Sequence, residues 1–187
     1  MAANDNHEVE IKFRIQDLNE LTARLSSAGF HEVTARTHEK NTLYDLPGDP
    51  LRKRGALLRL REYGPKWTVT YKDKPSVSGP HKSRREIETD VTNGPALAAM
   101  LEALGYQPRF TYEKFRREWT DGSGHVVIDE TLIGNFGEIE GQPAWIDRTA
   151  QLLEIAKSEY ITLSYTELFF RWKAETGSTI DNMVFGS

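Results

Sequence analysis

Glu8-Val9-Glu10-Ile11-Lys12-Phe13-Arg14-Ile15 carries a charged side chain at every even position and an apolar one at every odd position. Side chains two residues apart share a face of a β-strand, so this stretch predicts a strand with one charged and one apolar face. A solvated sheet face is the usual explanation of such a pattern. Like charges on neighbouring positions destabilise a strand, however, unless a group of opposite charge lies between them.

Alternation with period two recurs along the chain and predicts about eight strands, each bounded by Gly, Pro, Asn or Asp. The segments are residues 7–15, 32–44, 56–63, 66–73, 84–91, 109–120, 125–133 and 136–140. Helices are predicted to begin after Asp17, at Pro95, at Asp147 and after Ser164, the third running to residue 157 and the fourth ending near Gly177. Mostly antiparallel strands with flanking helices make an α+β protein. Residues 74–82, rich in Pro, Gly and Ser, predict a loop.

Length and composition narrow the class of protein. The chain has 187 residues, of which 28% are charged and 38% hydrophobic, which is typical of one globular domain. We expect a disordered tail at residues 1–6, a single domain at 7–178 and a C-terminal tail at 179–187. The absence of cysteine excludes disulfides, thiol catalysis and cysteine-bound zinc.

Charge and hydropathy also bear on partners and location. The net charge of -4 gives no basic excess for nucleic acid, and no apolar run is long enough to span a membrane. The first residues contain no apolar segment of a secretory signal, so we expect a cytoplasmic protein with neither nucleic-acid nor membrane partners.

The charged faces combine both signs. Their acidic members are Glu8, Glu10, Glu86, Glu88, Asp129, Glu138 and Glu140, and their basic members are Lys12, Arg14, Arg59, Arg61, Lys72, Arg84, Lys114 and Arg116. Stacked carboxylates suit a hard divalent cation such as Mg²⁺, whereas Arg and Lys suit phosphate oxygens. If the strands close into a barrel, these charges line an interior with room for one small ligand. The mixture predicts a polyanion held jointly by basic residues and metal ions, as in phosphoryl transfer.

Several short motifs occur in a fixed order. They are Glu8-Val9-Glu10-Ile11-Lys12, Leu58-Arg59-Leu60-Arg61, Thr70-Tyr71-Lys72, Arg84-Arg85-Glu86-Ile87-Glu88, Glu113-Lys114-Phe115-Arg116, Ile128-Asp129, residues 134–140 and Ser164-Tyr165. Together they resemble the CYTH superfamily, also called triphosphate tunnel metalloenzymes, over about residues 7 to 170. The superfamily includes class IV adenylyl cyclases, thiamine triphosphatases and inorganic triphosphatases.

The resemblance implies a closed eight-stranded antiparallel barrel that holds a small-molecule triphosphate with Mg²⁺ or Mn²⁺. Many members dimerise, so a homodimer stays open. Metal ligands are expected at Glu8, Glu10, Asp129, Glu138 and Glu140, with Asp129 alternatively orienting another ligand. Triphosphate ligands are expected at Lys12, Arg14, Arg59, Arg61, Lys72, Arg84, Lys114 and Arg116. Catalytic roles are expected for Lys12, Glu86 and Glu88, although the two glutamates equally suit an ion pair with Arg84.

Three functions remain open at this point. The leading hypothesis is metal-dependent hydrolysis of inorganic or organic triphosphates, because the recognisable side chains all address phosphate. An adenylyl cyclase is the alternative within enzymes, and residues 38–45 are similar to the corresponding strand of class IV cyclases. A non-catalytic polyphosphate or nucleotide sensor is the third, but Arg and Lys alone would suffice for a sensor. No P-loop or nucleophile elbow is present, so covalent catalysis is not expected.

Overall fold

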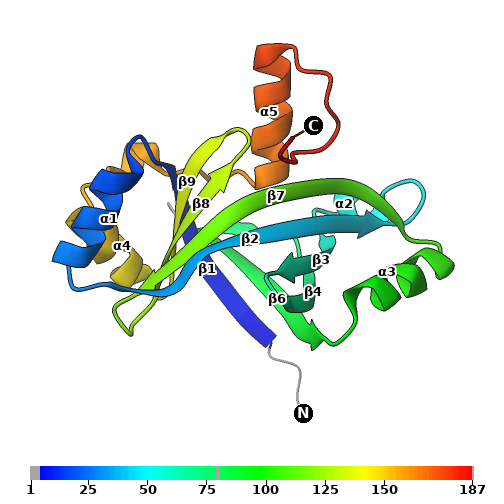
Figure 1. Cartoon of the computed structure of the whole chain (residues 1–187), viewed down its shortest axis with the longest axis horizontal. Coiled ribbons are helices and arrows are strands. Elements are labelled where there is room, and N and C mark those ends of the chain that lie inside the picture. The colour runs from blue at the N-terminus through cyan, green and yellow to red at the C-terminus, as the bar shows by residue number, and fades with distance from the viewer. Residues whose placement is uncertain (1–4, 79–80, 187) are drawn as a thin grey trace.

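The computed structural model describes residues 5–78 and 81–186, and within them the strands close into a barrel (Figure 1). The strands are β1 (Asp5–Arg14), β2 (His31–Asp45), β3 (Leu57–Tyr63), β4 (Lys66–Lys72), β5 (Ser76–Ser78), β6 (His81–Val91), β7 (Gln107–Thr120), β8 (His125–Thr131) and β9 (Gly134–Glu140). Neighbours follow the order β1-β9-β8-β7-β2-β3-β4-β6, and β6 pairs back to β1, so eight strands form a closed antiparallel barrel. All eight strands expected from the alternation are present.

The helices cover the outside of the barrel. They are α1 (Leu18–Ser27), α2 (Pro50–Lys53), α3 (Gly94–Ala103), α4 (Pro143–Leu152) and α5 (Tyr165–Thr176), with a short 3₁₀ turn at Lys157–Glu159. In Figure 1, α1 and α4 lie on one side of the barrel, α3 lies on the opposite side, and α5 projects from the top. Within the described residues no helix has the length and apolar character needed to cross a membrane.

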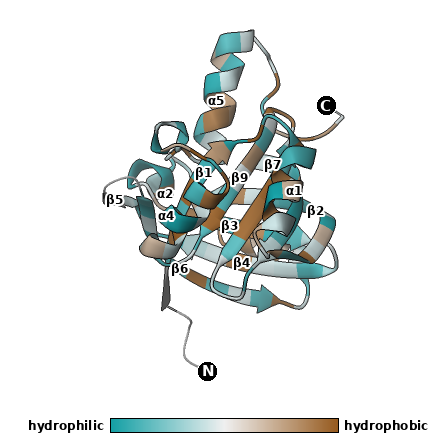
Figure 2. Ribbon diagram, turned by 90° about the vertical axis from the view of Figure 1, so that its left-hand side faces the viewer, coloured by the Kyte–Doolittle hydropathy of each residue, from teal (hydrophilic) through white to brown (hydrophobic). Residues whose placement is uncertain are grey.

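The apolar faces of the strands pack outward against these helices, and apolar and polar segments alternate along the strands in Figure 2. Ile11 and Phe13 of β1 join α1 and α4 in one core, Phe136 and Phe169 lie in a second core beneath α5, and Leu60 contributes to a third beneath α3. Because these side chains occupy the outer face, the alternating charges of the same strands must point into the barrel.

Three of the four predicted helices start within one residue of the expected position. The Asp17 and Ser164 side chains accept backbone N–H groups at the starts of α1 and α5, and Asn93 does so for α3. The third predicted helix is present, but its bounds of 147–157 are wrong, because α4 runs from Pro143 to Leu152. Proline is favoured in a first helical turn, and the buried Trp145 and Ile146 require the earlier start.

Three further segments differ from expectation. The expected loop at 74–82 contains β5 and the start of β6, which pair with each other. The expected N-terminal tail overlaps β1 at residues 5 and 6, and residues 1–4 lie outside the described part of the chain. The C-terminal tail packs back on β7, where Met183 is fully buried and exchanges backbone hydrogen bonds of 2.8 and 3.0 Å with Glu113 and Thr111.

Candidate active site

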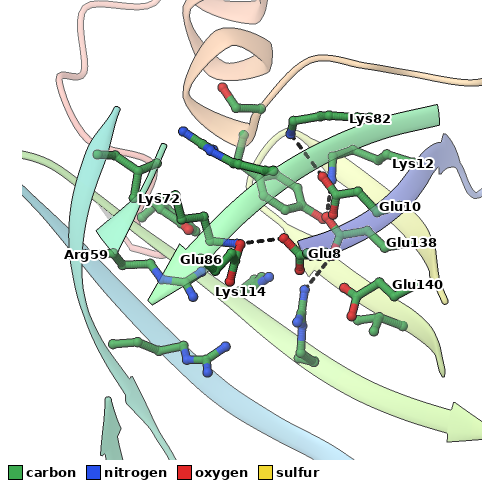
Figure 3. A pocket seen from close by; sticks show the side chains of 18 of the residues that line it. Glu8, Glu10, Lys12, Arg59, Lys72, Lys82, Glu86, Lys114, Glu138 and Glu140 are labelled. Atoms are coloured by element: carbon green, nitrogen blue, oxygen red, sulfur yellow. Dashed lines mark hydrogen bonds and ion pairs between the residues drawn. The ribbon is translucent and has the colours of Figure 1, made fainter. Parts of the chain in front are cut away.

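The barrel encloses a cavity of about 350 Å³ whose walls carry most of the predicted charges (Figure 3). Every predicted site residue lines it except Arg14 and Asp129. The cavity is also lined by Lys82, Glu118, His125 and Tyr112, and by residues 164–166 at the start of α5. The charged faces therefore meet inside the barrel rather than facing solvent.

Three carboxylates from two neighbouring strands meet in this cavity. Glu8 and Glu10 of β1 and Glu140 of β9 each offer an oxygen, and these oxygens lie within 4.8 Å of one another. Register brings them together, because Glu10 and Glu140 are direct cross-strand partners. Burial raises the pKa of Glu140 well above its usual value, and the charges of Glu8 and Glu138 raise it further. A divalent cation would relieve this repulsion, so the donor set suits Mg²⁺ or Mn²⁺.

A second group of charges is buried and internally paired. Asp129, which has no exposed surface, accepts hydrogen bonds from Arg116 Nε at 2.8 Å, Lys114 Nζ at 2.9 Å and the Tyr165 hydroxyl at 2.7 Å. Its oxygens are thus occupied by cations and a phenol. This arrangement makes Asp129 an anchor for Lys114 and Arg116, which fits the orienting alternative better than direct metal ligation.

Glu138 belongs to the same buried group rather than to the cluster of three carboxylates. It pairs with Lys12, its cross-strand neighbour, and with Arg116 at 2.7 Å. Burial alone would raise the pKa of Glu138, but the charges of Lys12 and Arg116 outweigh it and hold that pKa well below the usual value. Burial likewise lowers the pKa of Lys12, but Glu138 and Glu10 together raise it above normal. Lys12 is therefore a permanent cation and cannot act as a general base near neutral pH.

The opposite wall holds two arginines of β3. Arg59 donates to the Thr70 hydroxyl at 3.1 Å, and Arg61 donates to the Thr68 hydroxyl at 3.1 Å. Glu88 lies beside both, 3.4 Å from Arg59 and 3.2 Å from Arg61. Glu88 thus orients the arginine pair, which explains its presence on a wall that otherwise suits phosphate.

Lys72 links this wall to the carboxylate cluster. Its ammonium group pairs with Glu86 and lies 3.0 Å from Glu8. Burial and the hydrogen bond with Glu8 raise the pKa of Glu86 to about 7, although Lys72 opposes the rise. The pKa of Glu8 lies far below normal because Lys72 overcomes the effect of burial. Glu86 therefore holds a proton part of the time near neutral pH and shares it with Glu8, one of the predicted metal ligands.

Arg84 lines the cavity but is partly held by backbone. Its guanidinium donates to the carbonyl oxygens of Asp73 and Gly55, the latter at 3.2 Å. Burial lowers the pKa of Arg84 from its usual value. With one edge fixed in this way, the group is pre-oriented toward the cavity.

Arg14 is the one predicted triphosphate ligand that the structure does not bring to the cavity. It is the last residue of β1 and is exposed, with its guanidinium 4.9 Å from the Phe136 ring centroid. Alternation places Arg14 on the face of Lys12, and the residue is still paired with Phe136 of β9, but its guanidinium donates to the Ile133 carbonyl at 3.4 Å and does not line the cavity. Its binding role stays a prediction that the geometry does not support.

Sequence reasoning missed residues on two strands. Lys82 pairs with Glu10 at 2.9 Å. It lies on the same strand face as Arg84 and Glu86, but the predicted strand began only at residue 84, so Lys82 was assigned to the preceding loop. On β2 the inward face carries Glu39 and Asn41, both without exposed surface, whereas the neighbouring Lys40 is exposed. Glu39 lies 3.3 Å from Lys114 and 3.7 Å from Arg116. Polar residues on both faces of β2 hide this signal.

Comparison of the sequence with known protein families identifies one family over most of the chain. Residues 6–167 match the CYTH domain family. A putative adenylate cyclase of Methanocaldococcus jannaschii is 27% identical over 172 residues, covering 86% of this chain and 97% of that protein. The adenylate cyclase CyaB of Aeromonas hydrophila is 29% identical over 133 residues, covering 71% of this chain and 67% of the relative.

Solved structures share the fold. A putative adenylate cyclase from Vibrio parahaemolyticus superposes with a TM-score of 0.77 at 21% identity, covering 89% of this chain and 99% of that one. A putative adenylyl cyclase from Hippeastrum, described as having a dominant triphosphatase activity, superposes with a TM-score of 0.66 at 19% identity, covering 92% and 97%. Family match and barrel architecture coincide over nearly the whole chain, which belongs to the CYTH domain family.

Proposed function

We propose that this protein is a metal-dependent triphosphatase that hydrolyses a phosphoanhydride bond of a triphosphate held inside the barrel. The observation that carries the proposal is the juxtaposition of the Glu8, Glu10 and Glu140 oxygens with a wall of cations across one cavity. The enzymatic character of the family, whose relatives carry cyclase and triphosphatase names, supports it.

The residues divide into three roles under this proposal. Glu8, Glu10 and Glu140 would hold Mg²⁺ or Mn²⁺, which supplies charge neutralisation and activation of water. Arg59, Arg61, Lys72, Lys82 and Arg84 bind phosphate oxygens. Lys12, Lys114 and Arg116 are held in place by Asp129 and Glu138. They would balance the part of the triphosphate charge that the other cations leave.

The cavity is already crossed by ion pairs, which bears on binding. Lys72 and Lys82 contact Glu8 and Glu10, the same carboxylates that would hold the metal. A metal ion and a triphosphate entering together would exchange these pairs for carboxylate–metal and ammonium–phosphate contacts. Binding of metal and of triphosphate is therefore expected to be mutually reinforcing.

Adenylyl cyclase activity is the second candidate, because the similar proteins of M. jannaschii and A. hydrophila carry that name. A cyclase must also hold ribose so that its 3′ hydroxyl lines up on the α-phosphate. Hydrolysis asks only that a water molecule reach a phosphorus atom.

Chromatography of an ATP reaction containing Mn²⁺ separates the two candidates. We expect hydrolysis products to predominate, and tripolyphosphate to be at least as good a substrate as ATP. Cyclic AMP and pyrophosphate in excess over hydrolysis products would replace the triphosphatase proposal with the cyclase.

Arg59→Ala tests the phosphate wall. A hydrogen bond to a charged group contributes roughly 1.5–3 kcal/mol, so the dissociation constant for a methylene-bridged tripolyphosphate should rise by about one to two decades. Arg14→Ala is the matched control, because Arg14 shares the sequence pattern but lies outside the cavity. Calorimetry checks both variants. If both substitutions weakened binding of the analogue equally, the cavity would not be the triphosphate site.

A further inference from the structure

Glu39 of β2 places a negative charge behind the cations that suit phosphate. Its side chain has no exposed surface, and neither has that of Asn41, which lies on the same strand face. The Asn41 amide nitrogen donates to one carboxylate oxygen of Glu39 at 2.8 Å. Neither residue lines the cavity. Four cations whose charges act on Glu39 do line it: Arg59, Arg61, Lys114 and Arg116. The carboxylate therefore lies beneath the layer of cations that faces the cavity.

Strand register sets Glu39 between the two strands that carry these cations. Glu39 is the cross-strand partner of Lys114 on β7, and Asn41 is that of Arg61 on β3. One carboxylate oxygen of Glu39 lies 3.3 Å from Lys114 Nζ, and the other lies 3.7 Å from Arg116 Nε. Burial would raise the pKa of Glu39, but the four cations, Lys114 most strongly, outweigh burial and hold that pKa far below its usual value. Glu39 is therefore a permanent negative charge.

The cations do not depend on Glu39 for their orientation. Arg116 donates two hydrogen bonds to Asp129, at 2.8 and 2.7 Å, and Lys114 donates one at 2.9 Å, all shorter than the contacts of these cations with Glu39. The arginines of β3 are held by two threonine hydroxyls and by Glu88. Among the described residues, no group donates a hydrogen bond to the second carboxylate oxygen of Glu39. Glu39 therefore contributes charge to this wall rather than geometry.

A buried negative charge behind a wall of cations lowers the affinity of that wall for anions. The effect is strong inside a protein, where salt and water screen charges only weakly. A triphosphate and its shorter cleavage products are all anions that would meet the same cations. Uniformly tight binding of these anions does not raise turnover, and slow release of product lowers it. A fixed charge that weakens every such complex favours release.

We propose that Glu39 sets the affinity of the barrel for phosphate anions, weakening their binding to the cations of β3 and β7 so that cleavage products leave. This rests on the proposed function, because it assigns a role within the same site. The Glu39 carboxylate reaches the ligand through the electric field alone and touches neither the triphosphate nor the metal.

Glu39→Gln and Asn41→Asp test the proposal by changing the buried charge in opposite directions while nearly keeping the shape of each side chain. Calorimetry in mildly alkaline buffer with Mg²⁺ would measure the dissociation constants for methylene-bridged tripolyphosphate and for methylene diphosphonate, a stable analogue of pyrophosphate. We expect Glu39→Gln to lower both constants by about tenfold or more, and Asn41→Asp to raise both by a similar factor.

A purely structural role predicts a different result, because lost packing or hydrogen bonding would weaken binding in both variants. Asn41→Ala removes the same amide without adding charge and should leave both constants close to those of the wild type. Glu32→Gln is the matched control for Glu39→Gln, because Glu32 is an exposed glutamate of the same strand. Weaker or unchanged binding in Glu39→Gln would overturn the proposal.

Equal effects of Asn41→Asp and Asn41→Ala would also overturn it, and this comparison decides the matter if Glu39→Gln does not fold. The measurements involve no turnover, so they separate this proposal from the proposed function. The expected shifts in a protein that does not hydrolyse tripolyphosphate would refute only the proposed function. Failure of the wild-type protein to bind either anion would refute both.

Discussion

Glu10→Gln is expected to abolish most triphosphate turnover while leaving the fold intact. The substitution keeps the shape of the side chain but removes one of the three charges that meet within 4.8 Å. Even a residue that only orients a metal ligand is worth roughly 10–100-fold, so losing a ligand should lower turnover by about 100-fold or more. Glu10 is only partly buried, so water in the cavity can solvate the cations beside it once its charge is removed. The Tm should therefore change little.

Glu130→Gln is the matched control for this measurement. Glu130 is also a strand glutamate in an ion pair, with Arg36 at 2.9 Å, but it does not line the cavity. Phosphate release at saturating Mn²⁺ should be normal in Glu130→Gln. Normal turnover in Glu10→Gln would remove this residue from the proposed metal site.

Asp129→Asn should produce the largest loss of stability. Asp129 is fully buried and compensates Lys114 and Arg116, both of which are also buried. Removing one partner of a buried ion pair costs about 3–5 kcal/mol, and Lys114 and Arg116 would keep only Glu39 and Glu138 as partners. For a domain of this size that corresponds to a fall in Tm of roughly 6–20 °C.

Two comparisons sharpen the Asp129 prediction. Asp181→Asn removes an exposed ion pair with Lys173 and should leave the Tm nearly unchanged. Bound tripolyphosphate should recover part of the stability lost in Asp129→Asn, because phosphate supplies negative charge close to Lys114 and Arg116. A Tm equal to that of the wild type would mean that Asp129 does not neutralise Lys114 and Arg116.

The strands were predictable because period-two alternation is local and is strong in this chain. Glu8, Glu10 and Lys12 point inward, and Ile11 and Phe13 pack outward, as their parity requires. Closure of the barrel depends on the pairing of β1 with β6, which the sequence suggests only through the family resemblance. Arg14 was misplaced because alternation gives the face of a side chain but not whether a long side chain at the end of a strand reaches the cavity.

The division of labour among the charges was beyond sequence reasoning. Asp129 and Glu140 are both acidic residues of late strands, yet one is held by two cations and the other faces two carboxylates. Only the register of neighbouring strands, which sets Asp129 opposite Arg116 and Glu140 opposite Glu10, separates these roles. Glu39 was missed for a related reason, since its importance comes from Lys114 on the adjacent strand.

The central claim is that a divalent metal bound by the carboxylate cluster enables cleavage of a triphosphate. The most direct measurement is phosphate release from tripolyphosphate by the chelated protein, before and after addition of Mg²⁺ or Mn²⁺. The account predicts no release in excess EDTA and full recovery with either metal. Undiminished release in excess EDTA, or no release of phosphate with either metal present, would contradict it.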